Sequence, residues 1–221
     1  MIGIFILTLA LTMGVQMWLR NTYGKWERVA NASGLTGADT ARAILRANGL
    51  DDVQVEAVKG QLTDHYDPRT RTVRLSEKHF RVPSVAGAAV AAHEVGHALQ
   101  HAKSYAPLQW RASLVPVASI GSQFGPWVVI GGFMLGMAGM IQVGIALFAA
   151  AVLFQLVTLP VEFDASKRAV SEMNRLGLAT TADVGGSKAV LNAAAMTYVA
   201  AAAASVMYLL YYVMMFAGGR D

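Results

Sequence analysis

Two histidines and a glutamate stand close together in the segment His93-Glu94-Val95-Gly96-His97. On an α-helix, His93 and His97 lie one turn apart on the same face, so both imidazoles can bind one metal ion. Glu94 is rotated by about 100° from His93, so its carboxylate can lie beside a metal-bound water. Two histidine ligands, an open coordination position and a nearby glutamate are typical of zinc sites that hydrolyse peptide bonds. The alternative is a solvated helix face that carries these polar residues by chance, but alanine and valine surround the motif.

The chain has no cysteine, so a metal must be held by histidine and carboxylate groups. A carboxylate for the third position follows a long apolar stretch at Glu162, and Pro160 just before it suits the start of a helix. Asp164 is the competitor, but two positions along a helix it points away from Glu162, so both cannot bind the same ion. Either carboxylate could instead stabilise a helix N-terminus. The sequence favours Glu162 as the ligand and leaves Asp164 as an alternative ligand or a partner of the ligands.

Other residues could serve the same site. His101 lies one turn beyond His97, but peptidases with three histidine ligands place the third after a glycine turn that is missing here, so we expect His101 at the helix end. An oxyanion needs a hydrogen-bond donor besides the metal. His65, Tyr66 and His79 are candidates for this role or for substrate contact, although ordinary packing would explain them equally well.

The elements that must position these residues include membrane spans. Hydrophobic residues make up 55% of the chain and charged residues 14%, against about a quarter charged in globular proteins. Residues 1–19 are long enough for one span, 114–159 for a hairpin of two with a turn near 136–139, and 196–217 for a fourth. The first stretch could be a signal peptide, but no Lys or Arg precedes it and no small-residue cleavage site follows it. A transporter is disfavoured because 114–159 contains no ionisable residue.

Four spans place residues 20–113 and 160–195 on the same side of the membrane. These segments hold every Lys and Arg except Arg220, so the positive-inside rule predicts that they are cytosolic. The net charge of +4 is not gathered into a basic patch, and no nucleic-acid-reading motif accompanies it. The sequence therefore predicts contact with lipid and none with nucleic acid.

Residues 20–113 read as an α+β region. A helix is expected within 31–49, strands at 53–58, 62–66 and 72–75, and a long helix from Ser84 to His101. The strands suggest a small antiparallel sheet whose edge could pair with an extended peptide. The predicted fold is a mainly α, multi-pass membrane protein with four transmembrane helices. Its cytosolic part is zincin-like, and the segment 160–195 supplies the third ligand.

The segments His93–Gln100 and Leu159–Ser166 resemble the YugP-type zinc metallopeptidases of bacterial membranes. Asp64–Pro68 and Thr72–Ser76 are also similar to that family, so the resemblance covers essentially the whole chain. More distantly, the chain is similar to HtpX-type and CAAX-prenyl membrane proteases, which are gluzincins with a glutamate as third ligand. This kinship implies Glu162 as ligand and Glu94 as base. Those relatives commonly have an aspartate four residues after the ligand glutamate, where this chain has Ser166.

These observations predict a hydrolase with one Zn²⁺ per chain, held by His93, His97 and Glu162, with Glu94 as general base. Glu162 would lie only about 5 Å of helix beyond the third span, so we expect the zinc near the cytosolic membrane surface. Peptides or membrane proteins are the expected substrates, in the bacterial inner membrane and with quality control as the role. The alternative is a zinc-binding membrane regulator or adaptor that does not cleave peptide bonds.

Overall fold

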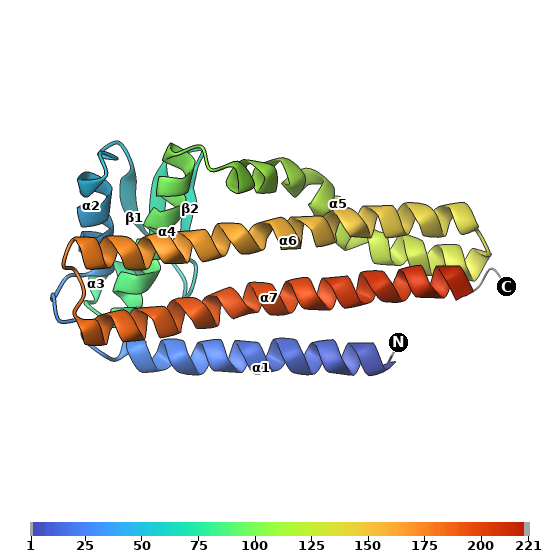
Figure 1. The fold of residues 1–221 in the computed structure, drawn as a ribbon, viewed down its shortest axis with the longest axis horizontal. Helices are drawn as coiled ribbons and strands as arrows, with labels where there is room; N and C mark the ends of the chain where they lie inside the picture. Colours follow the sequence, from blue (N-terminus) through green and yellow to red (C-terminus); the bar gives the residue numbers. More distant parts are fainter. Residues whose placement is uncertain (1, 219–221) are drawn as a thin grey trace. The chain divides into compact units, whose positions relative to one another are not determined.

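The computed structural model describes residues 2–218 and is mainly helical, with a small three-stranded sheet (Figure 1). The elements in chain order are α1 (Ile2–Glu27), α2 (Gly37–Ala47), β1 (Gln54–Val58), β2 (His65–Asp67), β3 (Thr72–Ser76), α3 (Glu77–Arg81), α4 (Val85–Ala102), α5 (Ala106–Leu135), α6 (Ala138–Arg175) and α7 (Thr181–Gly218). They form two compact units. The apolar unit comprises Met1–Val15, Ala106–Pro160 and Thr197–Asp221, and the mixed unit comprises Gln16–Tyr105 and Val161–Met196.

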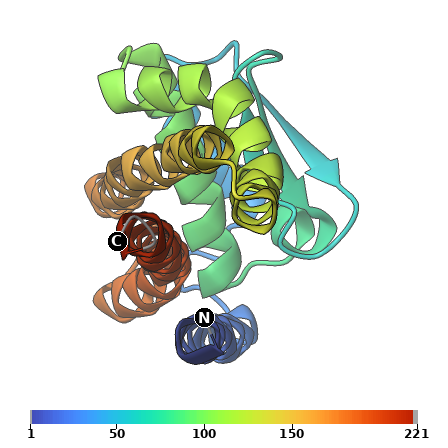
Figure 2. The same ribbon diagram turned by 90° about the vertical axis from the view of Figure 1, so that its right-hand side faces the viewer.

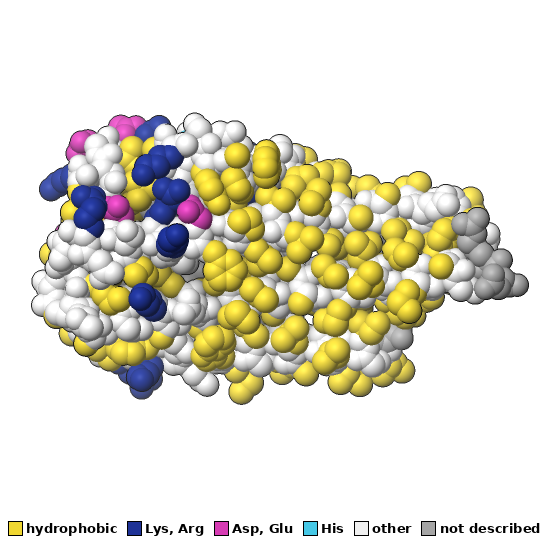
Figure 3. All heavy atoms as spheres, viewed as in Figure 1, with side chains coloured by type: hydrophobic (Ala, Val, Ile, Leu, Met, Phe, Trp, Pro, Cys, Tyr) yellow, Lys and Arg dark blue, Asp and Glu magenta, His cyan; other side chains and the backbone are white. Residues whose placement is uncertain are grey.

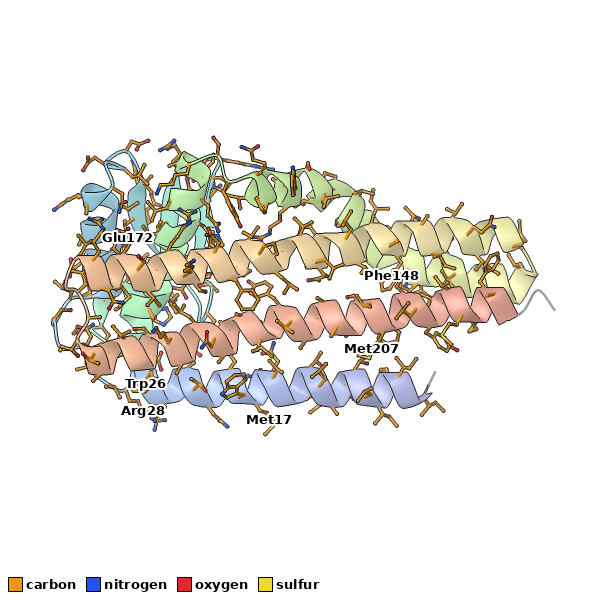
Figure 4. The ribbon with its side chains drawn as sticks, viewed as in Figure 1. Met17, Trp26, Arg28, Phe148, Glu172 and Met207 are labelled. Carbon is orange, nitrogen blue, oxygen red and sulfur yellow. The ribbon has the colours of Figure 1, made fainter. Side chains whose placement is uncertain are left out.

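Close contact between α5 and α6 organises the apolar unit. The two helices are joined at Gly136, whose φ of 64° suits a residue without a side chain, in the turn that the sequence predicted. A Cβ on Gly125 would lie 3.0 Å from atoms of Phe148 on α6, so the absence of a side chain lets the helices approach. Phe148, labelled in Figure 4, also packs edge-to-face on Tyr212 of α7.

Four helices are long and apolar enough to cross a membrane: α1, α5, α6 and α7. This confirms the four predicted candidate spans. Among the described residues of the apolar unit, Arg111 is the single Lys, Arg, Asp or Glu. Figure 3 shows apolar side chains spread over the surface of these helices. A lipid environment would cover such a surface without the cost of exposing it to water.

The expectation that Pro160 begins a new helix is wrong. Helix α6 continues through this residue from Ala138 to Arg175. A proline inside a helix removes one backbone donor, which long apolar helices tolerate when neighbouring groups satisfy the freed carbonyl. Glu162 therefore lies in the interior of a long helix rather than at a helix N-terminus.

The sheet of the mixed unit is not the antiparallel sheet that the sequence suggested. Its order is β1-β3-β2, in which β2 pairs antiparallel with β3 but β1 pairs parallel with it. Asp67 closes the β2–β3 turn by accepting hydrogen bonds from the Arg69 N–H and the Thr70 hydroxyl. Consecutive strands commonly pair, which favours a simple meander. Here β3 is buried almost throughout, so it takes the centre and pairs along both edges.

Two helices cover the sheet of the mixed unit. Thr36 starts α2 through a reciprocal capping box with Asp39. Helix α2 packs on α4, and both contact strands of the sheet, which lies to one side of α4 in Figure 2. The core is built from fully or almost fully buried apolar side chains, among them Ile44, Leu45, Val73, Leu75, Val95, Leu99 and Met173. This core fixes α4 against α6 and so holds the residues of the metal motif.

Candidate metal centre

Helix α4 carries His93, Glu94 and His97. Its first turn is capped by Ser84, whose hydroxyl accepts a hydrogen bond from the Gly87 N–H at 3.0 Å. The spacing of four residues places the two histidines side by side, with ring centroids 4.8 Å apart and ring planes at 84°. The sequence prediction that they share one helix face agrees with this geometry.

Glu162 reaches the histidines from α6. Its Oε2 lies 3.3 Å from His93 Nε2 and 3.7 Å from His97 Nε2. One ligand atom from each of the three residues fits within 4.8 Å of the others, which makes them a group able to hold a metal ion. Glu162 is 3% exposed, so its carboxylate is almost fully removed from water. Burying such a charge is costly unless a cation or a protonated partner compensates for it.

Gly96 allows the two helices to come close enough for this arrangement. It lies between the histidines on α4, and a Cβ at this position would be 2.5 Å from the backbone oxygen of Ala165 on α6. Its next contacts would also be backbone atoms of Ala165, at 3.1 Å, so no rotation of a side chain could relieve the clash. The approach of α6 to the histidine pair therefore depends on glycine at position 96.

Each histidine uses its other ring nitrogen for a hydrogen bond within the protein. His93 Nδ1 lies 3.1 Å from Ser166 Oγ, and His97 Nδ1 lies 3.0 Å from Gln100 Oε1. In both rings Nε2 is then the nitrogen that faces Glu162. Hydrogen bonds of this kind fix the orientation of metal-binding imidazoles. Ser166, four residues after Glu162 on α6, therefore provides the partner for His93.

Asp164 is not part of the group of three. Its Oδ2 accepts a hydrogen bond from Gln100 Nε2 at 2.9 Å and pairs with Arg168 Nε one turn later on α6. Gln100 is fully buried and also donates to the backbone oxygen of Val161 at 2.7 Å. Asp164 therefore contacts Gln100, the hydrogen-bond partner of His97, rather than the group of three itself.

The carboxylates around His97 raise its pKa. Burial alone would lower the pKa of His97, but its hydrogen bond to Glu162 and the charges of Glu94 and Glu162 raise it above the ordinary value. A proton and a metal ion compete for the same imidazole nitrogen. Glu94 itself is 8% exposed and follows His93 directly on the helix.

The structure does not bring the three oxyanion candidates together with the histidine pair. His65 is exposed, and its Nδ1 contacts the backbone oxygen of Thr63. The Tyr66 hydroxyl lies 2.9 Å from Nδ1 of His101, which occupies the last turn of α4 as expected. Tyr66 therefore meets the helix of the metal motif one turn beyond His97, through His101.

His79 belongs to a separate buried network. Its side chain is fully buried, with Nδ1 2.9 Å from Asp64 Oδ1 and Nε2 in contact with the Tyr23 hydroxyl. Tyr23 in turn donates to Glu27, which pairs with Lys78. Because both ring nitrogens have partners inside the protein, the position of His79 argues against the oxyanion role.

Two residues that matter to the site were missed in the sequence. Gln100 follows His97 by three positions, a spacing that places it on the same side of the helix, and this spacing could have singled it out. Gly96 has no such signal, because its importance comes from Ala165, which lies far away in the chain.

Comparison with known proteins identifies the family to which this chain belongs. Residues 1–217 match the family described as "Putative neutral zinc metallopeptidase". The chain is also 47% identical over 222 aligned residues, covering 99% of each chain, to a Bacillus subtilis (strain 168) protein named "Putative membrane protease YugP". No solved structure matches the chain. This match over nearly the whole length shows that the chain belongs to the family described as "Putative neutral zinc metallopeptidase".

Proposed function

We propose that the chain is a membrane-embedded, zinc-dependent endopeptidase of gluzincin-like type, with one Zn²⁺ held by His93, His97 and Glu162. The convergence of the Glu162 carboxylate on the two Nε2 atoms carries this proposal. Two imidazole nitrogens and one carboxylate oxygen form a donor set typical of catalytic zinc. Donor atoms about 2.0–2.1 Å from a tetrahedral zinc lie roughly 3.3 Å from one another. The distances of 3.3 and 3.7 Å from Glu162 Oε2 are close to this value, so the residues fit the ion.

When bound, zinc would supply Lewis acidity and lower the pKa of a water molecule to about 7. Glu94 is the residue of the motif that remains outside the ligand group, so its carboxylate is available to accept a proton from the attacking water. Glu94 then delivers this proton to the nitrogen of the peptide bond as the C–N bond breaks, and the water oxygen with its second proton remains on the new carboxyl group, which then ionises in water. His93 and His97 stay neutral throughout, with their Nδ1 atoms held by Ser166 and Gln100.

Zinc content and proteolysis test this assignment together. The protein purified in detergent is expected to retain zinc and to cleave casein or an unfolded membrane protein. A chelator should abolish cleavage, and added zinc should restore it. Glu162→Ala is expected to lose zinc, whereas Asp164→Ala is expected to keep it with weaker binding, because Asp164 contacts Gln100 and not the ligand group. Metal retained by Glu162→Ala and lost by Asp164→Ala would reverse the choice of ligand.

We propose further that the site works at the cytosolic face of the bacterial inner membrane, on membrane proteins or unfolded chains as part of quality control. The concentration of Lys and Arg in 20–113 and 160–195 supports the cytosolic side. Arg69 is exposed in the β2–β3 turn, and the chain has no native thiol. In Arg69→Cys, an impermeant maleimide added to intact cells should leave the new thiol unlabelled until the cells are opened. Labelling of intact cells would place this region outside.

A further inference from the structure

Gln100 is a buried amide whose orientation is dictated by its neighbours. Its Nε2 lies 2.7 Å from the backbone oxygen of Val161 and 2.9 Å from Asp164 Oδ2. A backbone carbonyl can only accept hydrogen bonds, and the carboxylate is kept as an acceptor by its ion pair with Arg168. If the amide group were rotated by 180°, Oε1 would face the Val161 carbonyl oxygen and Asp164 Oδ2, neither of which can donate a hydrogen bond. The NH₂ group must therefore face α6, and the oxygen must face His97.

The fixed orientation of the Gln100 amide determines which ring nitrogen of His97 carries the hydrogen. Gln100 Oε1 lies 3.0 Å from His97 Nδ1, and since this oxygen can only accept, Nδ1 must carry the hydrogen. The neutral ring then has its lone pair on Nε2, the nitrogen 3.7 Å from Glu162. His93 has no comparable constraint, because its partner Ser166 is a hydroxyl that can donate or accept.

The same amide also joins the two elements that supply the ligands. Gln100 belongs to α4, and the carbonyl that it binds belongs to Val161, the residue before Glu162 on α6. The contacts therefore run without interruption from Arg168 and Asp164 through Gln100 to His97. We propose that Gln100, oriented by Asp164 and Val161, is a positioning residue that holds His97 in its metal-binding tautomer and fastens α4 to the turn of α6 that carries Glu162. This proposal rests on the function proposed above.

The test compares two side-chain amides, each of which donates hydrogen bonds to one backbone carbonyl and one carboxylate. Gln100→Met keeps the length of the side chain but removes its hydrogen bonds, and zinc affinity is expected to fall by about 10- to 100-fold. Asn48 is the matched control. It donates to the Ile44 carbonyl at 2.8 Å and to Glu172 at 2.9 Å, and so connects α2 to α6 at Glu172, which is labelled in Figure 4. Asn48→Leu is expected to reduce thermal stability and leave zinc affinity unchanged.

Tautomer populations provide a readout other than activity. In metal-free protein with isotope-labelled histidine, at a pH at which the His97 ring is neutral, His97 is expected to carry its hydrogen on Nδ1, and Gln100→Met is expected to show both neutral tautomers by NMR. The double variant Gln100→Glu with Asp164→Asn restores an acceptor toward His97 and a donor at position 164, but it leaves the Val161 carbonyl without its donor. It is expected to recover part of the lost affinity, and it decides the question if Gln100→Met does not fold.

Unchanged zinc affinity in Gln100→Met, or a double variant that folds but binds zinc no better than Gln100→Met, would overturn the positioning role. Different results would refute the proposed function. A wild-type protein that binds zinc and cleaves nothing would refute the peptidase and leave the comparison of affinities intact. A wild-type protein that binds no zinc would refute both.

Discussion

Replacing Glu94 with glutamine is expected to lower kcat for peptide hydrolysis by about 10²- to 10⁴-fold, the usual contribution of a general base. Glutamine has nearly the same shape but cannot take up the proton of the attacking water. Zinc content should not change, because the ligand group consists of His93, His97 and Glu162. Both quantities can be measured on one preparation, zinc by elemental analysis and kcat with a fluorogenic peptide or casein.

Glu172→Gln is the control for this substitution. Glu172 is a partly buried glutamate of the mixed unit that binds Arg175 and Asn48 and has no contact with the ligand group. It is expected to retain activity. If Glu94→Gln cleaved as fast as the wild type, Glu94 would not be the base. If zinc disappeared with the activity, the role of Glu94 would be metal retention instead.

Gly96→Ala is expected to have the second-largest effect, because one methyl group would separate the two helices that supply the ligands. The added Cβ would meet the Ala165 backbone at 2.5 Å, and neither backbone can yield without moving a helix. Alanine normally favours a helix interior over glycine by about 1 kcal/mol, whereas overpacking costs about 1–3 kcal/mol. We therefore expect lower thermal stability and a large loss of zinc affinity, both measurable by thermal melts and chelator competition.

Gly185→Ala is the matched control for the helix-propensity effect. Gly185 is also a helical glycine of the mixed unit, on α7, and a Cβ there would meet no atom within 4 Å. This variant should be as stable as the wild type or slightly more stable, with unchanged zinc affinity. A Gly96→Ala protein that bound zinc as tightly as the wild type would show that α4 and α6 can separate without opening the site.

The pairing of His93 with His97 could be predicted because it depends on local geometry, whereas Glu162 was singled out by its place just beyond the third span and by the resemblance to membrane metallopeptidases. A spacing of four residues places two histidines on one helix face whatever surrounds the helix. The same periodicity separates Asp164 from Glu162, which is why one carboxylate faces the histidines and the other faces Gln100. The spans were predictable for a similar reason, since length and apolar composition are properties of each segment alone.

The features that the sequence did not reveal depend on contacts between distant segments. Strand β1 has the sequence pattern of one arm of a meander, but in the structure it pairs parallel with the buried central strand β3. His79 looked available for catalysis until Asp64 and Tyr23 were found at its two nitrogens. Gly96 is another example, because the need for glycine at this position becomes visible only from the Ala165 backbone that lies against it.

The order in which the ligands occur along the chain has a consequence for biosynthesis. His93 and Glu162 are 69 residues apart, and all of α5 and the first part of α6 lie between them. A chain emerging from the ribosome exposes the histidine motif first and folds from its N-terminal side. The set of three ligands is complete only after the second apolar helix of the hairpin has been made. A partly synthesised chain therefore lacks the complete set of proposed ligands, so the proposed hydrolytic activity could begin only once this hairpin exists.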